Sequence, residues 1–369
     1  MKITPFALER HFAKYEFTAP YLLCCSDCEA IKLSELLEMA DQECLTLWKE
    51  LGLGYTESMG HPLLRKEIAT LYEQIAPQEV LVTAPEEGVY LAMQTLLKKG
   101  DHVVVTGPGY QSLSEVAVSL GCTLSLWVPN WERERGWEFW VEELYKLITK
   151  KTKLLIINFP HNPTGAVLTE ADLNRVVEIA RERGIPIFSD EMYRYLEHDA
   201  SQRLPSVAEI YERGIALSGL SKSFALPGLR IGWLISKDKA ILQSCAFYKD
   251  YTTICNSAPS EVLALMGLRS KGEIVQRNME IISRNLELLD AFFSRHADLF
   301  SWHRPSASSI AFPKFLSPQS VSHYCDQLIQ KSGVMLLPAP LFGLNGPYFR
   351  IGYGRKNLPD ALARWEETL

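Results

Sequence analysis

The hydrophobic pattern of the chain changes near Val80. Before that point, apolar residues such as Leu33, Leu36 and Leu37 recur at helical spacing among polar ones. This periodicity predicts amphipathic helices within residues 6–48. A turn-rich connection then leads into the second half of the pattern.

From Val80 onward, short apolar runs alternate with amphipathic segments. The runs predict strands at residues 79–83, 102–106, 122–128, 153–158, 185–188 and 214–217. The segments between them predict helices, among them residues 85–98, 112–120 and 169–184. In the last of these, Thr169 suits the N-cap and Gly184 suits the end of the helix. Alternation of this kind implies an α/β fold, with a mostly parallel central sheet covered by helices on both faces.

After Trp233 the alternation fades. The pattern there predicts a long helix over residues 274–293, strands over 333–337 and 348–353, and a closing helix from Pro359. These elements predict a second, smaller α+β domain, and the N-terminal helices are assigned to it because they also lie outside the alternating region. The expected division is a large domain over residues 49–245 and a small domain formed by residues 1–48 and 246–369.

Polar side chains follow several of the predicted strands. Asn162 comes soon after the strand 153–158, and Asp190 follows the strand 185–188. Ligands of open parallel sheets bind beyond the carboxyl ends of the strands. The spacing between Asn162, Asp190 and Lys222 is about one βα unit each, so we expect these side chains to converge at one edge of the sheet. Tyr110 follows the strand 102–106 and belongs to the same edge.

Lys222 lies just beyond the buried strand 214–217. Poor solvation of an amine lowers its pKa and raises its nucleophilicity at neutral pH. Arg230, eight residues later beyond a Pro-Gly break, offers the planar fork that grips a phosphate. This pair suggests an aldehyde cofactor held as a Schiff base, whereas the alternative interpretation of Lys222 is a surface lysine on a loop.

Composition excludes some classes of protein. The chain has 369 residues, of which 47% are hydrophobic and 22% charged, as in a globular protein of about two domains. Its net charge of −6, without any basic block of five or more residues, argues against nucleic-acid binding. No apolar run approaches the roughly 18 residues that span a bilayer, which argues against a membrane protein. Because the N-terminus lacks the apolar core of a signal peptide, the predicted location is cytoplasmic.

Three of the eight cysteines, Cys24, Cys25 and Cys28, lie close together in the sequence. A zinc or redox role would need a second ligand pair or a strand-to-helix context, and the sequence shows neither. We interpret them as reduced thiols, and no metal site is predicted.

Three motifs in order carry a resemblance to a known family. They are Asn162-Pro-Thr-Gly165, Ser189-Asp-Glu-Met-Tyr193, and Ser221-Lys222 followed by Arg230. Together they resemble the class I/II branch of the aminotransferases, which are fold-type I pyridoxal-phosphate-dependent enzymes. The resemblance covers roughly residues 51–353, and it implies that fold, pyridoxal 5'-phosphate as cofactor, and a homodimer with active sites at the interface.

The resemblance also implies roles for residues around the cofactor ring. Lys222 would form the Schiff base and then move the substrate α-proton. Asp190 would pair with the pyridine nitrogen and keep it protonated, so that the ring accepts electrons. Tyr193 and Asn162 would hydrogen-bond the phenolic oxygen, and Asn162 would also lie beside the substrate. Tyr110 would stack on the ring face.

Other residues would bind the phosphate and the substrate. Arg230 would clamp the phosphate, and the helix that opens at Glu86 and Glu87 would present backbone N–H groups to it. Tyr55 resembles the family tyrosine that reaches a phosphate across the dimer interface. Arg350, in a predicted strand, resembles the arginine that binds the substrate α-carboxylate bidentately.

Two positions depart from the family pattern. Relatives usually have a glycine and a small residue at the phosphate loop, where this chain has Pro85, Glu86 and Glu87. These carboxylates suit the helix dipole but repel a phosphate, so at least one should turn away or bind a cationic group. Relatives also often have a phosphate-binding serine at the position of Gly219, so one phosphate ligand is missing or displaced.

The predicted function is transfer of an amino group between an α-amino acid and a 2-oxo acid. One alternative is lyase or cyclase chemistry on an amino acid, because the same cofactor serves all of these reactions. Another is a pyridoxal-phosphate-binding sensor without turnover, although no segment of the chain suits a DNA-binding module. By analogy, Tyr15, Tyr21 and residues 24–27 are candidates for reading the substrate side chain.

Overall fold

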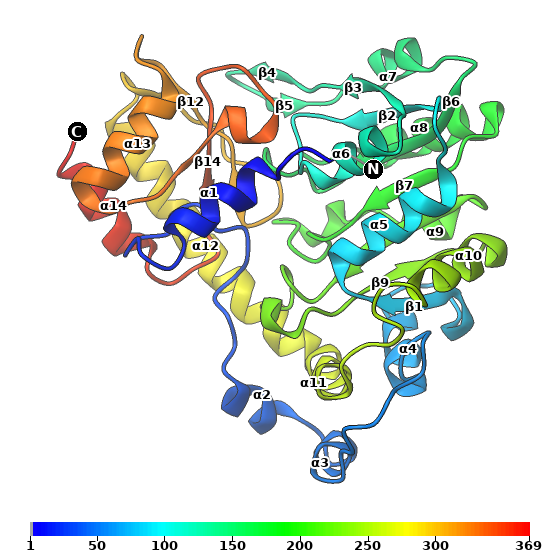
Figure 1. Ribbon diagram of the computed structural model, residues 1–369. Coiled ribbons are helices and arrows are strands. Elements are labelled where there is room, and N and C mark those ends of the chain that lie inside the picture. Colours follow the sequence, from blue (N-terminus) through cyan, green and yellow to red (C-terminus); the bar gives the residue numbers. More distant parts are fainter. Residues whose placement is uncertain (1–2) are drawn as a thin grey trace.

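A seven-stranded sheet forms the centre of the computed structural model, which describes residues 3–369. Its strands are β1 (Val80–Thr83), β2 (His102–Thr106), β3 (Thr123–Trp127), β6 (Thr152–Asn158), β7 (Ile187–Asp190), β8 (Gly214–Gly219) and β9 (Gly232–Ile235). They lie in the order β1-β9-β8-β7-β6-β2-β3 (Figure 1). The five strands from β8 to β3 pair in parallel, and only β9 runs against its neighbours. The predicted α/β fold with a mostly parallel sheet is confirmed.

The register of the central strands brings their carboxyl ends level. Asn158, the last residue of β6, pairs with Asp190, the last residue of β7. Asp190 in turn pairs with Leu217 near the end of β8. The loops that follow these strands therefore start at the same edge of the sheet, as expected from the sequence.

Helices cover both faces of this sheet because successive strand residues point to opposite sides. Val103 and Val105 of β2 pack in one core with α5 (Pro85–Leu96), α6 (Ser112–Ser119) and α10 (Lys239–Lys249). Val104, between them, packs on the other side in a core with α7 (Val141–Leu147) and α8 (Glu170–Arg183). Thr169 caps α8 by accepting a hydrogen bond from Asp172 N, and Gly184 ends it in the left-handed conformation, as predicted.

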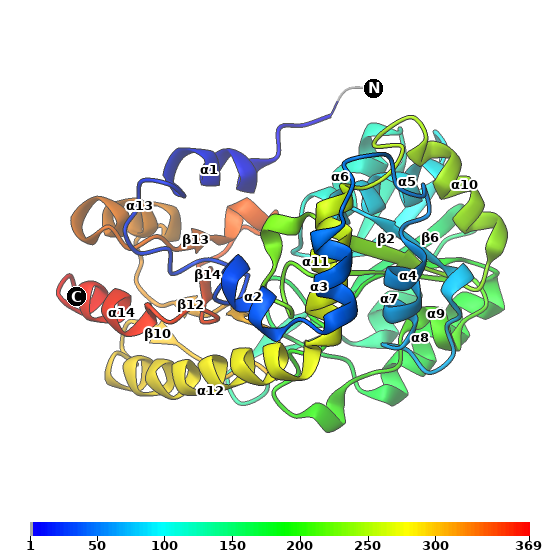
Figure 2. The same ribbon diagram turned by 90° about the horizontal axis from the view of Figure 1, so that it is seen from below.

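The remaining elements form smaller sheets beside this layer. They are β10 (Phe300–Ser301), β11 (Ile310–Ala311), β12 (Lys314–Phe315), β13 (Leu337–Pro338) and β14 (Phe349–Gly352), with α12 (Lys271–Arg295), α13 (Val321–Ser332) and α14 (Leu358–Glu366). Their shared core is rich in aromatic residues, including Phe292, Phe300 and Trp365. The long helix α12 runs from this part toward α11 (Ala258–Arg269) (Figure 2). The expected second, smaller α+β domain is confirmed.

The N-terminal helices pack against different parts of the molecule. The first, α1 (Ala7–Tyr15), lies beside the short helix η4 (Ala339–Phe342) in the smaller part. In contrast, α2 (Leu33–Met39) and α3 (Gln42–Lys49) pack against α11, and α3 lies beside it in Figure 2. The exact boundaries at residues 48 and 245 stay a prediction.

Some local predictions were wrong. A continuous strand over residues 333–337 is not formed, because Gly333 adopts the left-handed conformation and ends α13; Val334 makes only an isolated bridge with Tyr21, and β13 starts at Leu337. The strand expected at 185–188 is β7, two residues later, so Asp190 ends the strand rather than following it. The hairpin of β4 (Asn130–Glu132) and β5 (Gly136–Glu138) was missed.

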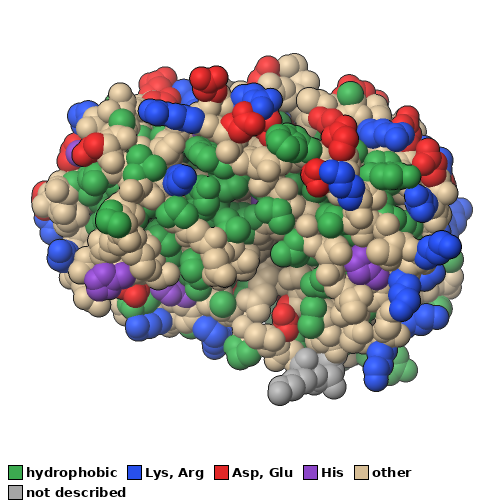
Figure 3. Space-filling view, turned by 90° about the horizontal axis from the view of Figure 1, so that it is seen from above, with side chains coloured by type: hydrophobic (Ala, Val, Ile, Leu, Met, Phe, Trp, Pro, Cys, Tyr) green, Lys and Arg blue, Asp and Glu red, His purple; other side chains and the backbone are tan. Residues whose placement is uncertain are grey.

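One face of the molecule shows acidic and basic side chains together around its rim, with hydrophobic side chains between them (Figure 3). Among residues 3–369, no helix is both long enough and apolar enough to cross a membrane.

Gly352 of β14 tests how tightly the N-terminal segment packs on this strand. A Cβ atom at Gly352 would lie 1.9 Å from the carbonyl oxygen of Cys25. We expect Gly352→Ala to lower the free energy of unfolding by about 1–3 kcal/mol, as overpacking usually does. Chemical denaturation measures this, with Gly272→Ala as control, since a Cβ at Gly272 has nothing within 4 Å. Equal stability of the two variants would contradict the packing described.

Candidate active site

Lys222 lies in the loop that follows β8. Its Nζ donates a hydrogen bond of 2.7 Å to Ser26 Oγ of the N-terminal segment. Burial lowers the pKa of the amine, while the negative charge of Asp27 opposes this shift. The lysine is therefore a partly accessible amine with a greater neutral fraction than a lysine in water.

Asp190 ends β7 and is buried. Its Oδ1 accepts a hydrogen bond of 3.1 Å from Met192 N. Burial raises the pKa of this carboxyl to about 7; the Met192 N–H and the charge of Lys222 act against the shift, and nearby Glu86 adds to it. Among residues 3–369, Asp190 forms no ion pair within 4.0 Å, as would suit a group that pairs with a protonated ring nitrogen.

Asn162 and Arg350 are brought together, although they lie 188 residues apart. Arg350 Nη1 donates to Asn162 Oδ1 at 3.1 Å, and Nη2 donates to the carbonyl oxygen of Cys24 at 3.0 Å. The side chain is almost fully buried and its guanidinium lies over the ring of Phe342, with 5.1 Å to the centroid. Its Nε makes no hydrogen bond.

Asn158 is a site residue that the sequence analysis missed. Its Oδ1 accepts from Asn162 N at 2.8 Å and its Nδ2 donates to the Asp190 carbonyl at 3.0 Å. It therefore holds the loop after β6 against the end of β7. The sequence does contain a sign of this role, because Asn158 is a polar residue at the end of an otherwise apolar run.

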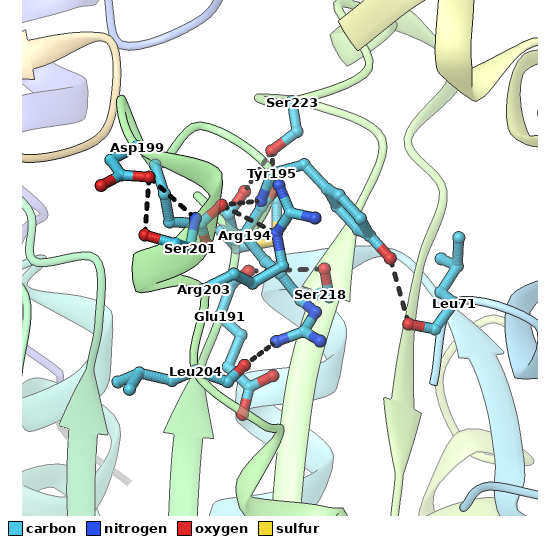
Figure 4. Close-up of polar contacts among 12 residues, drawn as sticks. Leu71, Glu191, Arg194, Tyr195, Asp199, Ser201, Arg203, Leu204, Ser218 and Ser223 are labelled. Carbon is cyan, nitrogen blue, oxygen red and sulfur yellow. Dashed lines mark hydrogen bonds and ion pairs between the residues drawn. The ribbon is translucent and has the colours of Figure 1, made fainter. Parts of the chain in front are cut away.

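The loops that follow β7 and β8 are tied to each other (Figure 4). Ser218 Oγ donates to the Glu191 carbonyl at 3.5 Å, and Ser223 Oγ donates to the Arg194 carbonyl. Tyr193 lies in the sequence between Glu191 and Arg194, the two residues whose carbonyls accept these bonds. The contacts therefore fix the position of Lys222 relative to Tyr193. Tyr193 Oη is buried and makes no hydrogen bond.

Tyr110, Glu86 and Arg230 lie on the side where the phosphate was expected. The Tyr110 ring packs on Phe6, with 4.9 Å between centroids. The Glu86 residue is exposed to solvent. Even so, the protein atoms packed around its carboxyl raise the pKa, and hydrogen bonding to Ser112 acts against this shift. Arg230 is exposed, and its Nη1 donates to the Pro227 carbonyl at 2.9 Å.

Glu87 has a carboxylate held by other groups. Its Oε2 accepts from Thr83 Oγ1 at 2.6 Å, and its Oε1 accepts from Thr253 Oγ1 at 2.8 Å and from Thr252 Oγ1. These bonds lower the pKa of the carboxyl against the opposing effect of burial, which is the largest single contribution. Only the backbone N–H of Glu87 is left for a phosphate.

The two departures from the family pattern are in contact with each other. A Cβ at Gly219 would lie 3.2 Å from Pro85 Cγ and 3.0 Å from Gly232 Cα. A Cβ at Gly232 would lie 2.9 Å from Pro85 Cγ. The proline ring therefore rests where side chains of these two strand positions would otherwise be, which explains why Gly219 stands in place of a serine.

Tyr55 is not brought to the site within one chain. Its side chain is 91% exposed, and so is that of Tyr251. Thr56 Oγ1 donates to the Asn256 carbonyl at 3.1 Å, which joins the segment carrying Tyr55 to the loop that follows Tyr251.

The chain matches the family model "Aminotransferase class I and II" over residues 36–364. The chain belongs to this family. A PLP-dependent aminotransferase from Streptococcus suis has the same fold, with a TM-score of 0.92, 33% identity, and coverage of 100% of this chain and 98% of that one. The PLP-dependent cyclase OrfR superposes with a TM-score of 0.91 and 25% identity, over 100% of this chain and 98% of its own.

Among the sequence relatives of this chain is the aromatic-amino-acid aminotransferase 2 of Thermococcus litoralis. It is 28% identical over 329 residues, which cover 85% of this chain and 84% of the relative. Pyridoxal 5'-phosphate is therefore the expected cofactor.

The residues present fit this cofactor. Two buried polar atoms, Tyr193 Oη and Arg350 Nε, make no hydrogen bond within the described residues. They lie in the same group of loops as the lysine amine of Lys222 and the buried carboxyl of Asp190. Such unsatisfied buried groups are rare in folded proteins and indicate a bound molecule.

Asp190 gives the protein a pH dependence of stability that can be measured without cofactor. A carboxyl with a pKa of about 7 when folded, against about 3.9 when unfolded, binds its proton more tightly in the folded state. Its stabilising contribution is complete below about pH 4 and is lost as the pH rises to 7. The free energy of unfolding of the wild type, relative to Asp190→Asn, should therefore fall over this range by a few kcal/mol, on the order of 1.4 per pKa unit.

Denaturation of both proteins at a series of pH values measures this difference. Asp298→Asn, at an exposed surface position, is the control and should show no such trend. Parallel curves for wild type and Asp190→Asn would contradict the assignment of a buried, proton-binding carboxyl.

Proposed function

We propose that this aminotransferase moves an amino group between an α-amino acid and a 2-oxo acid, with pyridoxal phosphate held as a Schiff base on Lys222. The observation that carries the proposal is the arrangement of Lys222, Asp190 and Arg350 around the loops at the carboxyl edge of the sheet. Lys222 provides an amine for the cofactor and the α-proton, and Asp190 provides a buried carboxyl for the ring nitrogen. Arg350 provides a buried guanidinium for the substrate carboxylate.

Lys222 has the properties of both a nucleophile and a proton carrier. Its lowered pKa gives it an unprotonated fraction at neutral pH, and the accessible Nζ is held by a hydroxyl rather than by a carboxylate. When the amino acid has taken its place on the cofactor, the free Nζ of Lys222 would act as the base that moves the proton from the substrate α-carbon. The cofactor supplies an electron sink that stabilises the negative charge left at that carbon.

Asp190 and Tyr193 set the electronic state of the ring. Asp190 would hold a proton at the ring nitrogen, because a cationic partner restores the ionised form of a buried carboxylate. Tyr193 Oη would donate to the phenolic oxygen and thereby gain the partner that it lacks.

Arg350 would bind the α-carboxylate of the substrate. Its guanidinium is already fixed by Asn162 and by the Cys24 carbonyl, so little entropy is lost when a carboxylate arrives. Planar guanidinium and carboxylate groups match in a bidentate geometry.

Arg230 and the first turn of α5 would hold the phosphate. A helix N-terminus presents unpaired N–H groups, although Pro85 contributes none, so those of Glu86 and Glu87 are the available ones. Glu86 turns its carboxyl toward Ser112 and Tyr110, and Tyr110 is proposed to cover the ring face.

We further propose that the protein is a homodimer. Tyr55 and Tyr251 are each 91% exposed and lie in two segments that the Thr56–Asn256 hydrogen bond joins, and exposed apolar patches often mark protein–protein interfaces. The proposed interface places Tyr55 of each subunit at the other subunit's phosphate site. The proposed domains are residues 49–245, and residues 1–48 with 246–369, and the proposed location is the cytoplasm.

Cyclisation or elimination on an amino acid is the second candidate. It is favoured by the likeness to the cyclase OrfR, which is nearly as close in fold as the aminotransferase from Streptococcus suis.

A spectrum of the protein loaded with pyridoxal phosphate separates these functions. Addition of single amino acids without a 2-oxo acid should convert the absorption of the lysine-bound cofactor into that of its amine form. A 2-oxo acid added afterwards should restore the first spectrum. Release of pyruvate, ammonia or a cyclic product instead would favour the second candidate.

Lys222→Ala should abolish the absorption band of the lysine-bound cofactor. Borohydride treatment followed by peptide mass analysis should locate the reduced cofactor on Lys222 in the wild type. The control is Lys153→Ala, an exposed lysine of β6, which should leave the band intact. Persistence of the band in Lys222→Ala would show that the assignment is wrong.

Arg350→Gln should weaken substrate binding through loss of the bidentate contact. Removal of one partner of a buried charge pair costs about 2–5 kcal/mol, so the KM of the amino acid should rise at least thirtyfold. The matched control is Arg304→Gln, whose ion pair with Asp290 is largely exposed. An unchanged KM for Arg350→Gln, in a protein with wild-type circular dichroism, would exclude it as the carboxylate ligand.

A further inference from the structure

The N-terminal helix α1 lies over the part of the site that carries Tyr110. Ala7 N donates to Gln111 Oε1 at 2.8 Å, next to the Phe6–Tyr110 ring contact. Within α1, Glu9 Oε1 accepts from Tyr110 Oη at 3.5 Å. The carboxylate of Glu9 thus faces the same tyrosine that is proposed to cover the cofactor ring.

Two further carboxylates lie near Glu9. One is Glu86 in the first turn of α5, where burial and the charge of Glu9 raise the pKa of the carboxyl. The other is Glu16, just beyond α1, where burial and again the charge of Glu9 raise the pKa; Arg355 and Lys222 act in the opposite direction. Glu9 therefore interacts with both, and the set extends from Tyr110 toward Lys222.

No cation of the described chain neutralises these three carboxylates. Within residues 3–369, none of them forms an ion pair with a lysine, arginine or histidine within 4.0 Å. The nearby cations have other partners: Arg355 pairs with Asp27 at 2.9 Å and Lys222 donates to Ser26. Arg230, whose charge also acts on Glu86, donates to the Pro227 carbonyl and is the proposed phosphate ligand. Glu9 and Glu16 are partly buried and Glu86 is exposed, and three neighbouring carboxylates without an ion-pair partner favour a cation from outside.

A second observation indicates that a ligand binds beside these carboxylates. Ser112, at the start of α6, is only 4% exposed, and its Oγ lies beside the Glu86 carboxyl without making a well-formed hydrogen bond. A buried hydroxyl without a well-formed hydrogen bond is rare in a site that is filled by protein alone.

We propose that Glu9, together with Glu16 and Glu86, binds a cationic group at the far end of the substrate side chain. The inference rests on the proposed function, since Arg350 takes the α-carboxylate and Lys222 the α-amino end. The substrate class is then an α-amino acid with a second amine or a guanidinium. Arg355 could otherwise bind the side chain of an acidic substrate, but it is already paired with Asp27.

Two matched sets of amino acids test the proposal on the cofactor-loaded protein. In one set, L-arginine is compared with L-citrulline, which has nearly the same shape without the charge. In the other, L-lysine is compared with L-norleucine and L-2-aminoadipate. Affinity is measured from the change in the cofactor spectrum and independently by calorimetry, at low and at moderate salt.

We expect the cationic member of each set to bind at least tenfold more tightly than its neutral partner. The advantage should shrink as salt is raised, since screening weakens interactions between accessible charges. Glu9→Gln should reduce the ratio of arginine to citrulline affinity to about two, and Glu16→Gln should reduce it partly. Glu182→Gln, on the exposed surface of α8, should leave the ratio unchanged.

Equal affinity for arginine and citrulline, or tighter binding of 2-aminoadipate than of lysine, would overturn the proposal. In those cases conversion of the cofactor by a neutral or acidic amino acid would still support the proposed function. If no amino acid at all changed the spectrum of a protein that binds the cofactor, the proposed function itself would fail.

Discussion

The parallel register of β6, β7 and β8 is the constraint on which the rest of the site depends. It sets Asn158, Asp190 and Leu217 level at one edge, and the loops that carry Asn162, Tyr193 and Lys222 begin from that line. Asn158 then bonds to the loop that follows β6 and to the last residue of β7, so the edge is stiff where a ligand would touch it. Buried strands without freedom to slip give the site its precision.

The charged groups of the site lose hydration when the chain folds, and this loss lowers the stability of the folded state. Within residues 3–369, Asp190 forms no ion pair although the charge of Lys222 acts on it, and Arg350 keeps Nε without a hydrogen bond although it is almost fully buried. A ligand that completes these contacts adds free energy only to the folded state, so cofactor and substrate would stabilise the protein as well as react in it. The apolar cores on both faces of the sheet offset the cost.

The sequence predicted six of the seven strands of the central sheet, all except β9, and most of the positions at its edge, because both are encoded locally. A buried strand appears as a continuous apolar run, and the residue that ends it is read directly. Contacts made by distant segments left no such trace: nothing in residues 24–28 indicates that Ser26 touches Lys222, or that Cys24 holds Arg350. The short hairpin of β4 and β5 was missed because its Trp131–Trp137 ring contact depends on a fold that local patterns do not show.

The contact between Pro85 and the paired glycines 219 and 232 ties the cofactor loop to the sheet by shape. A side chain at either glycine would meet the proline ring, and β8 and β9 also approach each other there at backbone distance. A serine at Gly219 would meet the backbone of Gly232 and Ile231 as well as the Pro85 ring, so replacement of Pro85 by a smaller residue would relieve only part of the crowding. A change from this glycine to the serine of relatives therefore requires β8 and β9 to move apart as well as a change at Pro85.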